Sequence, residues 1–193
     1  MNVGKMAKIL IACEKSERVK NAFRAKGHDA WSCDVLPPEQ DGQYHIQDDV
    51  LKHLDDGWDM MIAHPDCTYL ANSGVRWLIG NPERYRRMVE ACRFFNILLN
   101  ADIPQIAIEN PIQHKYARRF IRKPDQIIQP WWFGEGETKA TCLWLKGLPP
   151  LMATLIHPER YGRVFREPPS PERSANRSRI YLGIAKAMAD QWG

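Results

Sequence analysis

The stretch "KILIACEKSERVKNAFRAKGHD", residues 8 to 29, indicates the fold class of this chain. Its first part, "KILIACE", is a compact apolar run of the kind that forms a buried strand. The second part places Val19, Ala22 and Phe23 at helical spacing, and Gly27 is a typical helix stop signal. The pattern therefore predicts a strand, a turn and a helix in succession.

The same alternation continues along the chain. The segment 81–101 has Asn81 and Pro82 at the start of a helical apolar pattern, which is a helix N-terminal signal. Apolar runs predict further strands at 29–35, 58–64 and 103–111, and a short helix that opens with two acids is predicted at 48–54. Alternating strands and helices predict an α/β fold, a doubly wound and mostly parallel sheet with helices on both faces.

The length of 193 residues favours one domain. Within it we expect a parallel βα core over 8–124. From 125 to 180 the apolar runs around a Gly-Glu-Gly turn predict an antiparallel pair and then a Pro-rich, basic stretch. Residues 150–178 hold five prolines and are expected to be extended or mobile. Residues 181–193 are predicted to form a C-terminal helix.

Charge is distributed unevenly along the chain. Residues 1–67 carry eight Lys/Arg and twelve Asp/Glu, whereas 68–193 carry nineteen and eleven. Six arginines of the second part fall in one Pro-rich stretch, at positions 160, 163, 166, 173, 177 and 179. Clusters of cations attract a phosphate backbone, although a charge run is often only a solvated surface. The pattern favours nucleic acid as a partner of the second part, and DNA is the partner that the resemblance described below implies.

No segment has the pattern of a signal peptide or of a membrane span, so we expect no membrane partner and an intracellular, cytoplasmic location. The five cysteines are odd in number, widely spaced and without CxxC pairing. This pattern argues against a disulfide framework and against a zinc site. At least some of the cysteines are expected to be free thiols.

Polar residues follow four of the predicted strands, at Cys13–Ser16, Asp34, His64–Tyr69 and Glu109–Asn110. Ligands of open parallel sheets bind beyond the carboxyl ends of the strands. We therefore expect these four clusters to converge on one rim of the sheet.

Cys67 is the best candidate nucleophile, because it lies in a polar loop after a strand. Cys92 and Cys142 lie in apolar patterns and are expected in the core. Glu109 ends an apolar run, so burial is expected to raise its pKa and make it a proton donor. The alternative for Glu109 is a structural ion pair, for example with Arg118.

The order of these features resembles the DNA cytosine-C5 methyltransferases, including small phage-encoded members. The post-strand cysteine and the Glu-Asn pair are the specific elements, and "GETKATCLWLKGLPPL" and "RSRIYLGIAKAMADQW" are also similar to such phage proteins. The resemblance implies the class I S-adenosylmethionine-dependent methyltransferase fold. It implies that Cys67 attacks C6 of cytosine and that Glu109, with Asn110, contacts N3.

The resemblance also implies S-adenosylmethionine as the cofactor. Asp34 matches the acid that binds the cofactor ribose, and Asp49 matches the aspartate near its adenine. The remaining residues that it places around the cofactor are Cys13, Glu14, Ser16 and Pro65.

This chain departs from the family pattern in three places. Asp66 stands where the family has proline directly before the cysteine, and its carboxylate is expected to raise the pKa of Cys67. The turn after the first strand has no glycine. Only about 60 residues follow position 125, fewer than a large target-recognition region needs. We therefore expect low sequence specificity, or a protein partner that supplies it.

Lys139, Arg177 and Arg179 are candidate phosphate contacts, although each is also compatible with ordinary surface charge. One of Trp131 and Trp132 is expected in the core, and for the other both the core and stacking on a base stay open. The sequence therefore favours a DNA cytosine-C5 methyltransferase or a close derivative. Two alternatives stay open: a C5-modifying enzyme that acts on a free pyrimidine nucleotide, and a methyltransferase fold that has lost catalysis and binds a nucleotide or a protein. Amino-group methylation is disfavoured, because "HPDC" matches the loop that this reaction needs only at Pro65.

Overall fold

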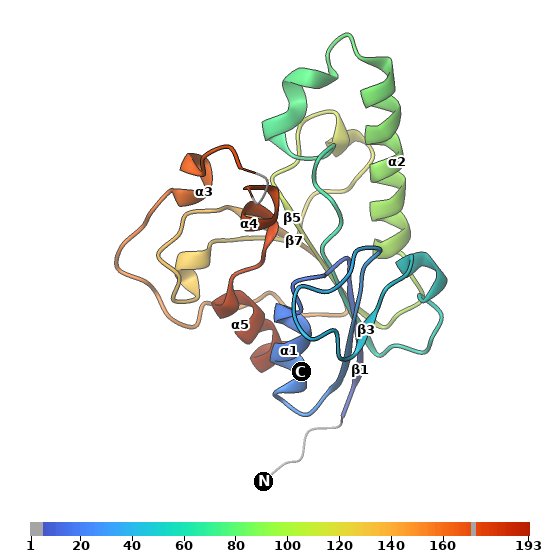
Figure 1. The fold of residues 1–193 in the computed structure, drawn as a ribbon, viewed down its shortest axis with the longest axis vertical. Helices are drawn as coiled ribbons and strands as arrows, with labels where there is room; N and C mark the ends of the chain where they lie inside the picture. Colours follow the sequence, from blue (N-terminus) through green and yellow to red (C-terminus); the bar gives the residue numbers. More distant parts are fainter. Residues whose placement is uncertain (1–5, 171–172) are drawn as a thin grey trace.

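The computed structural model describes residues 6–170 and 173–193. They form a seven-stranded sheet with the strand order β3-β2-β1-β4-β5-β7-β6 (Figure 1). The strands are β1 (Lys8–Ala12), β2 (Asp29–Cys33), β3 (His45–Ile46), β4 (Met60–Ala63), β5 (Gln105–Pro111), β6 (Gln126–Ile128) and β7 (Thr141–Lys146). Strands β1 to β5 pair in parallel, and β7 runs antiparallel to both of its neighbours. The predicted α/β fold with a mostly parallel sheet is confirmed.

The α-helices are α1 (Arg18–Arg24), α2 (Pro82–Leu99), α3 (Arg163–Arg166), α4 (Arg173–Ser178) and α5 (Leu182–Trp192). Short 3-10 turns are η1 (Val50–Lys52), η2 (Asn72–Leu78), η3 (Ala117–Arg119) and η4 (Pro130–Trp132). Helix α2 begins as predicted, because the Asn81 side chain accepts a hydrogen bond from the backbone N–H of Arg84 at 2.9 Å and Pro82 occupies the first turn.

Helices cover both faces of the sheet, as the alternating pattern predicted. On one face, Phe95 and Leu98 of α2 pack with Leu10 of β1. On the other face, Phe23 of α1 packs with Ile9 of β1 and with the apolar side of α5. Successive residues of a strand point to opposite faces, so β1 supplies side chains to both cores.

The antiparallel pairing expected after residue 125 is confirmed, since β6 pairs with β7. This pair continues the main sheet, because β7 also pairs with β5. The expectation of an extended segment over 150–178 is wrong in part, since α3 and α4 interrupt it. Strand β3 escaped prediction because only two residues pair.

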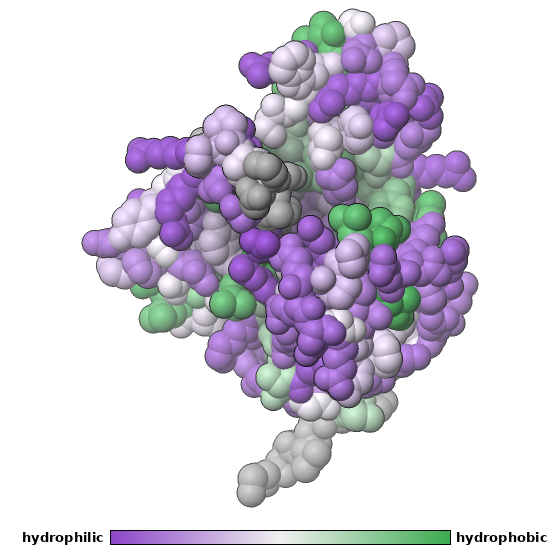
Figure 2. Space-filling view, in the orientation of Figure 1, coloured by the Kyte–Doolittle hydropathy of each residue, from purple (hydrophilic) through white to green (hydrophobic). Residues whose placement is uncertain are grey.

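Among the described residues, no helix has the length and apolar character that a membrane crossing requires. The face shown in Figure 2 carries mostly hydrophilic residues, and hydrophobic residues form small, separate areas on it. Both cores are therefore well covered on this side of the molecule.

Candidate active site

Four polar side chains follow one continuous row of paired strand residues. Ala12 of β1 pairs with both Cys33 of β2 and Ala63 of β4, and Ala63 pairs with Ile108 of β5. The next residue of each strand is therefore found at the same rim. These residues are Asp34, Cys13, His64 and Glu109. The register places together the clusters that were expected to converge.

One side-chain hydrogen bond holds the loop after β4 against β5, and two more stabilise the loop internally. The Asn110 side-chain amide donates to the backbone carbonyl of Pro65 at 2.8 Å, and both residues are buried. Asp66 is exposed, and its carboxylate accepts hydrogen bonds from the backbone N–H and the hydroxyl of Thr68, at 3.0 and 2.7 Å. The loop therefore accommodates Asp66 by turning its side chain to the solvent, and Cys67 follows at the rim.

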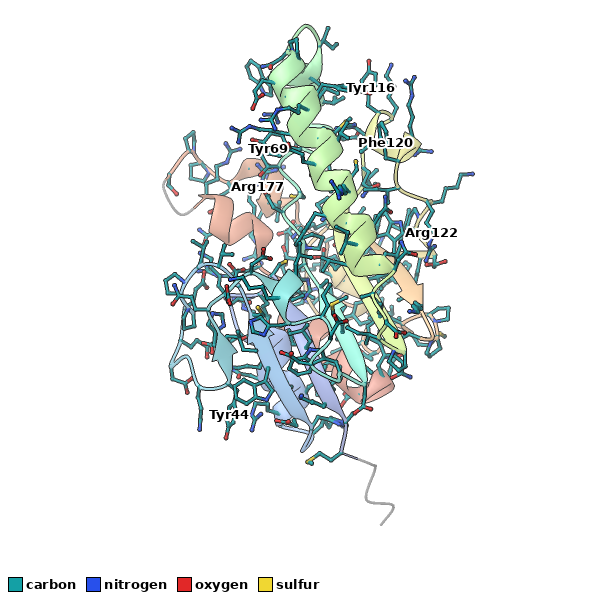
Figure 3. All side chains as sticks on the ribbon, turned by 90° about the vertical axis from the view of Figure 1, so that its right-hand side faces the viewer. Tyr44, Tyr69, Tyr116, Phe120, Arg122 and Arg177 are labelled. Carbon is teal, nitrogen blue, oxygen red and sulfur yellow. The ribbon has the colours of Figure 1, made fainter. Side chains whose placement is uncertain are left out.

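A second set of contacts joins the residues after Cys67 to those after Asn110. The His114 ring nitrogen Nε2 lies 2.9 Å from the Tyr69 carbonyl, and the His114 backbone N–H donates to the Leu70 carbonyl at 2.9 Å. Nδ1 of the same ring accepts from the Ala117 N–H at 3.1 Å, so Nε2 carries the proton. Tyr69 lies at the upper end of the molecule in Figure 3, far from Tyr44. These contacts fix the loop of Cys67 to the segment that follows β5, the strand that carries Glu109.

Glu109 pairs with His64 rather than with Arg118. His64 Nδ1 lies 3.2 Å from a carboxylate oxygen of Glu109, whereas Arg118 is exposed. Burial alone would raise the pKa of Glu109, but the His64 hydrogen bond and the positive charge of Lys139 outweigh burial, and the pKa lies below its ordinary value. The expected raised pKa is therefore wrong, because the buried carboxylate has partners that stabilise its charge.

The Cys67 thiol has a pKa raised to about 11. Burial is the main cause, and the negative charges of Asp66 and Glu109 add to it, while Lys139 acts in the opposite direction. The effect expected of Asp66 is confirmed. Since Glu109 and Lys139 both influence the sulfur, the three side chains share one electrostatic environment.

Cys67 is expected to react with iodoacetamide about tenfold faster for each pH unit between pH 7 and 9.5, because its pKa of about 11 leaves the thiolate scarce over this range. Asp66→Asn removes a negative charge near the sulfur and is expected to speed alkylation about two- to tenfold at pH 8. Peptide-resolved mass spectrometry measures both rates. A plateau near pH 8.5, or an unchanged rate in Asp66→Asn, would contradict this account.

The other four cysteines are free as well. Cys92 and Cys142 are buried in the core, as expected. Cys13 follows β1 and is half-buried, and burial raises the pKa of its thiol. None of these three sulfurs lies in the loop after β4, so the structure leaves Cys67 as the candidate nucleophile.

A small cavity of about 80 Å³ lies between the turn after β1 and His64, and Cys13, Glu14 and Ser16 contribute to its walls. Nε2 of His64 is buried and has no hydrogen-bond partner among the described residues. Because Nδ1 of that ring donates to Glu109 when the histidine is neutral, Nε2 is then a free acceptor. The cavity therefore offers an unused acceptor to a ligand with an N–H group.

The side chains of Glu14 and Ser16 are already engaged. The buried Glu14 carboxylate accepts hydrogen bonds from the backbone N–H groups of Val19 and Lys20, at 2.8 and 3.2 Å, and from the Ser16 hydroxyl at 3.1 Å. These are free N–H groups of the first turn of α1, so Glu14 caps this helix. Both residues thus shape the cavity wall while they also stabilise α1.

The turn after β1 keeps a backbone conformation that favours glycine. Cys13 and Glu17 have φ values of 58° and 60°. Such a conformation costs roughly 1–2 kcal/mol for a residue with a side chain. The turn therefore adopts positive φ values at two residues that carry side chains, Cys13 and Glu17.

A group of charged side chains borders the same cavity. Arg179 Nε donates to a Glu39 carboxylate oxygen at 2.8 Å, and Lys15 lies 3.3 Å from the other oxygen. Arg179, a candidate phosphate contact, is thus engaged with the loop after β2. Glu39 was missed because it lies outside every strand-end cluster, and only the fold brings it to Arg179.

The two acids assigned to the cofactor ribose and adenine lie on the rim. One Asp34 oxygen accepts from the Leu36 N–H at 2.9 Å, and one Asp49 oxygen caps η1 by accepting from the Leu51 N–H at 3.0 Å. Each carboxylate thus stabilises a turn with one oxygen. The second oxygen of each has no hydrogen bond to the described residues and is a possible ligand acceptor.

Lys139 precedes β7 and lies beside the candidate catalytic pair. Its ammonium group donates to the Arg177 carbonyl at 2.8 Å and influences the pKa of both Glu109 and Cys67. Figure 3 shows Arg177 at the same end of the molecule as Tyr69. Lys139 is therefore a cation of the candidate active site itself.

One tryptophan of this segment packs against the core, as expected. Phe133 is the buried aromatic of this segment, while Trp131 and Trp132 are both half-buried. Trp132 packs against the core, and the Arg160 guanidinium lies 3.9 Å from the centre of the Trp131 ring. One face of Trp131 is thus already covered by a cation.

Sequence reasoning missed two histidines that organise the site. His64 lies within the predicted loop cluster, but nothing in the sequence shows that it pairs with Glu109, 45 residues away. His114 lies only four residues after Asn110, yet its bond to Tyr69 also spans 45 residues. The parallel pairing of β4 with β5 creates both contacts.

No protein-family model matches the chain, and no curated protein matches it. Two solved structures are similar to it. One is described as a DNA modification methyltransferase encoded within a prophage of E. coli, with 13% identity and a TM-score of 0.50 over 79% of this chain and 52% of that chain. The other is the methyltransferase EhMeth of Entamoeba histolytica, with 14% identity and a TM-score of 0.50 over 81% of this chain and 58% of that chain.

The chain therefore spans little more than half the length of these two structures. At such low identity the likeness concerns the fold. Together with the seven-stranded sheet in which only β7 is antiparallel, these comparisons give the chain the class I methyltransferase fold.

Proposed function

We propose that this chain is a DNA cytosine-C5 methyltransferase that uses S-adenosylmethionine. The observation that carries the proposal is that the loop of Cys67, after β4, is hydrogen-bonded through Pro65 to Asn110, the neighbour of Glu109 in the carboxyl-terminal part of β5. A nucleophile next to a carboxylate suits attack on a pyrimidine ring with protonation of its ring nitrogen. The similar prophage structure, described as a DNA modification methyltransferase, supports DNA as the substrate.

The residues present fit the cofactor chemically. His64 Nε2 offers a buried acceptor to the ammonium group of its amino-acid end, and Lys15 and Arg179 are cations beside the same cavity. The free oxygens of Asp34 and Asp49 suit the ribose and the adenine. The cavity of about 80 Å³ takes only the amino-acid end, since pockets for whole ligands measure roughly 300–1,000 Å³. When bound, the cofactor supplies the methyl group.

The ionised state of Glu109 gives it a role in moving a proton. The target base is first flipped out of the duplex into the site. The Cys67 sulfur then forms a bond to C6, and its proton passes to the Glu109 carboxylate and from there to N3 of the ring. C5 thereby gains the electron pair that takes up the methyl group. The C5 proton is then lost to water and the sulfur–C6 bond breaks, and the N3 proton returns through Glu109 to the sulfur, which regenerates the thiol.

His64 is a positioning residue in this scheme. By donating from Nδ1 to one oxygen of Glu109, it orients the carboxylate and leaves the other oxygen for the proton transfer. Asn110 acts in a similar way on the loop of Cys67, through its hydrogen bond to Pro65. Lys139 supplies a positive charge that favours the thiolate.

Expression of the chain in a bacterium that lacks cytosine-C5 methylation is expected to produce 5-methylcytosine in DNA, and expression of Cys67→Ser is not. Mass spectrometry of hydrolysed DNA, with the nucleotide pool analysed in parallel, measures this directly. Modification of the free pool alone would place the reaction on a nucleotide. An identical signal from Cys67→Ser would remove Cys67 from the mechanism.

A protein that has lost catalysis is the second candidate, favoured by Asp66 and by the small cavity. Calorimetry with S-adenosylmethionine distinguishes an active methyltransferase from a protein that has lost catalysis. Heat of binding that is lost in His64→Ala supports the methyltransferase. No heat and no thermal shift across a wide concentration range count against it.

A further inference from the structure

A hollow of about 640 Å³ lies outside the candidate active site, around α3. Three arginines line it, Arg160, Arg163 and Arg166, together with Tyr161 and Gly136. In Figure 1, α3 lies on the left, on the opposite side of the molecule from α2, and Figure 2 shows mainly hydrophilic residues over this part of the face. The hollow is therefore an open, cationic surface.

The arginines are held in place by neighbours that leave their N–H groups available. Arg160 stacks on Trp131 at 3.9 Å, a contact with the ring face that leaves the edge of the guanidinium free. Arg163 donates through Nε to the buried Glu137 at 3.3 Å, while its side chain is 73% exposed. Arg166 is exposed. Guanidinium groups that present several N–H donors match phosphate oxygens.

Three arginines outnumber Glu167, the one acid that lines the hollow. Glu167 accepts a hydrogen bond from the Asn176 side chain at 2.9 Å. The hollow thus carries an excess of positive charge.

The hollow is coupled through the backbone to the candidate active site. The Thr138 N–H and hydroxyl both donate to the Tyr161 carbonyl, at 2.7 and 2.9 Å. Lys139, which influences Cys67 and Glu109, is the next residue. Gly136 on the wall is three residues from Lys139, a span of at most about 11 Å of extended chain. A DNA strand bound in the hollow would therefore lie close to a target base at Cys67.

We propose that the hollow formed by Arg160, Arg163 and Arg166 binds the sugar–phosphate backbone of the DNA strand that carries the target base. This inference rests on the proposed function for its choice of DNA. A single nucleotide has one phosphate position at its ribose, whereas three arginines spread over an open hollow match successive phosphates of a chain. The arginines of the Pro-rich stretch thus lie at different sites. Arg179 borders the candidate cofactor cavity, whereas Arg160, Arg163 and Arg166 line the outer hollow.

The test is fluorescence anisotropy of a labelled DNA duplex with the full chain, without S-adenosylmethionine, over a range of NaCl concentrations. Arg160→Gln/Arg166→Gln is expected to weaken binding about 10- to 100-fold and to reduce the slope of log K against log[salt] by about 1.8. Arg163 is left intact, because its removal would leave the buried Glu137 without its cation.

The matched control is Lys26→Gln/Arg93→Gln, which removes the same charge after α1 and on α2. Its binding is expected to change less than about twofold with an unchanged slope, so an equal loss in both double variants would overturn the proposal. Displacement of the duplex by millimolar deoxycytidine monophosphate would also overturn it, in favour of a nucleotide site. Since no methyl donor is present, the binding result is independent of catalysis. If the duplex binds through these arginines but cells that express the chain contain no 5-methylcytosine, the proposed function is contradicted and the DNA-binding site is not.

Discussion

Cys67→Ser is expected to abolish methyl transfer, with a loss of at least about 10⁴-fold in rate. The hydroxyl replaces the only candidate sulfur in the loop after β4, and serine is a far weaker nucleophile toward C6. The same variant is expected to form no covalent complex with DNA that contains 5-fluorocytosine. Transfer of labelled methyl groups to DNA and denaturing gels of the trapped complex measure the two effects.

The control for this variant is Cys92→Ala, on the buried face of α2. It is expected to keep the methyl transfer rate within about twofold while lowering the free energy of unfolding by about 1 kcal/mol. Cys67→Ser should show the reverse, a lost rate and an unchanged melting temperature. Trapping that persists in Cys67→Ser would assign the nucleophile elsewhere.

Glu109→Gln is expected to have opposite effects on two reactions of the same site. An amide cannot take up the thiol proton and pass it to N3, so methyl transfer should fall about 10²- to 10⁴-fold. Removal of the negative charge lowers the pKa of Cys67, so alkylation by iodoacetamide at pH 8 should become faster, by about two- to tenfold. Both rates are measured on one preparation, with the melting temperature as the check on folding.

This opposition separates a chemical role of Glu109 from a structural one. If the carboxylate only held the loop in place, Glu109→Gln would lower the melting temperature together with the rate of methyl transfer. Methyl transfer unchanged in Glu109→Gln would contradict the proposed proton path. His64→Ala serves as the comparison, because it removes the group that orients Glu109 and keeps the carboxylate.

The position of the candidate site followed from local patterns. Short apolar runs end at Ala12, Ala63 and Ile108, and these ends form one row in the sheet. Residues that follow such ends lie on one rim in any parallel arrangement, so the convergence of Cys67 and Glu109 depended little on strand order. Local patterns also excluded Cys92 and Cys142 as candidate nucleophiles, since helical and strand periodicity already placed them in the core.

The electrostatics of the site did not follow from local patterns. Glu109 was expected to be a protonated acid because it ends a buried strand, and its pairing with His64 reverses this. Arg179 was expected at the DNA, and it pairs with Glu39, 140 residues away. The charge state of a buried group depends on every charge around it, and sequence distance does not reveal those neighbours.

The sequence by itself determined the order of the main strands and helices, without β3, α3 and α4, and the rim on which Cys67, Glu109 and Asn110 lie, because periodicity and strand ends are local properties. The tertiary structure alone decided which side chains meet there: His64 with Glu109, Asn110 with Pro65, and three arginines around one hollow. These contacts arise from strand pairing and loop packing between distant segments, and hydrogen bonds and charge interactions act only over a few ångströms.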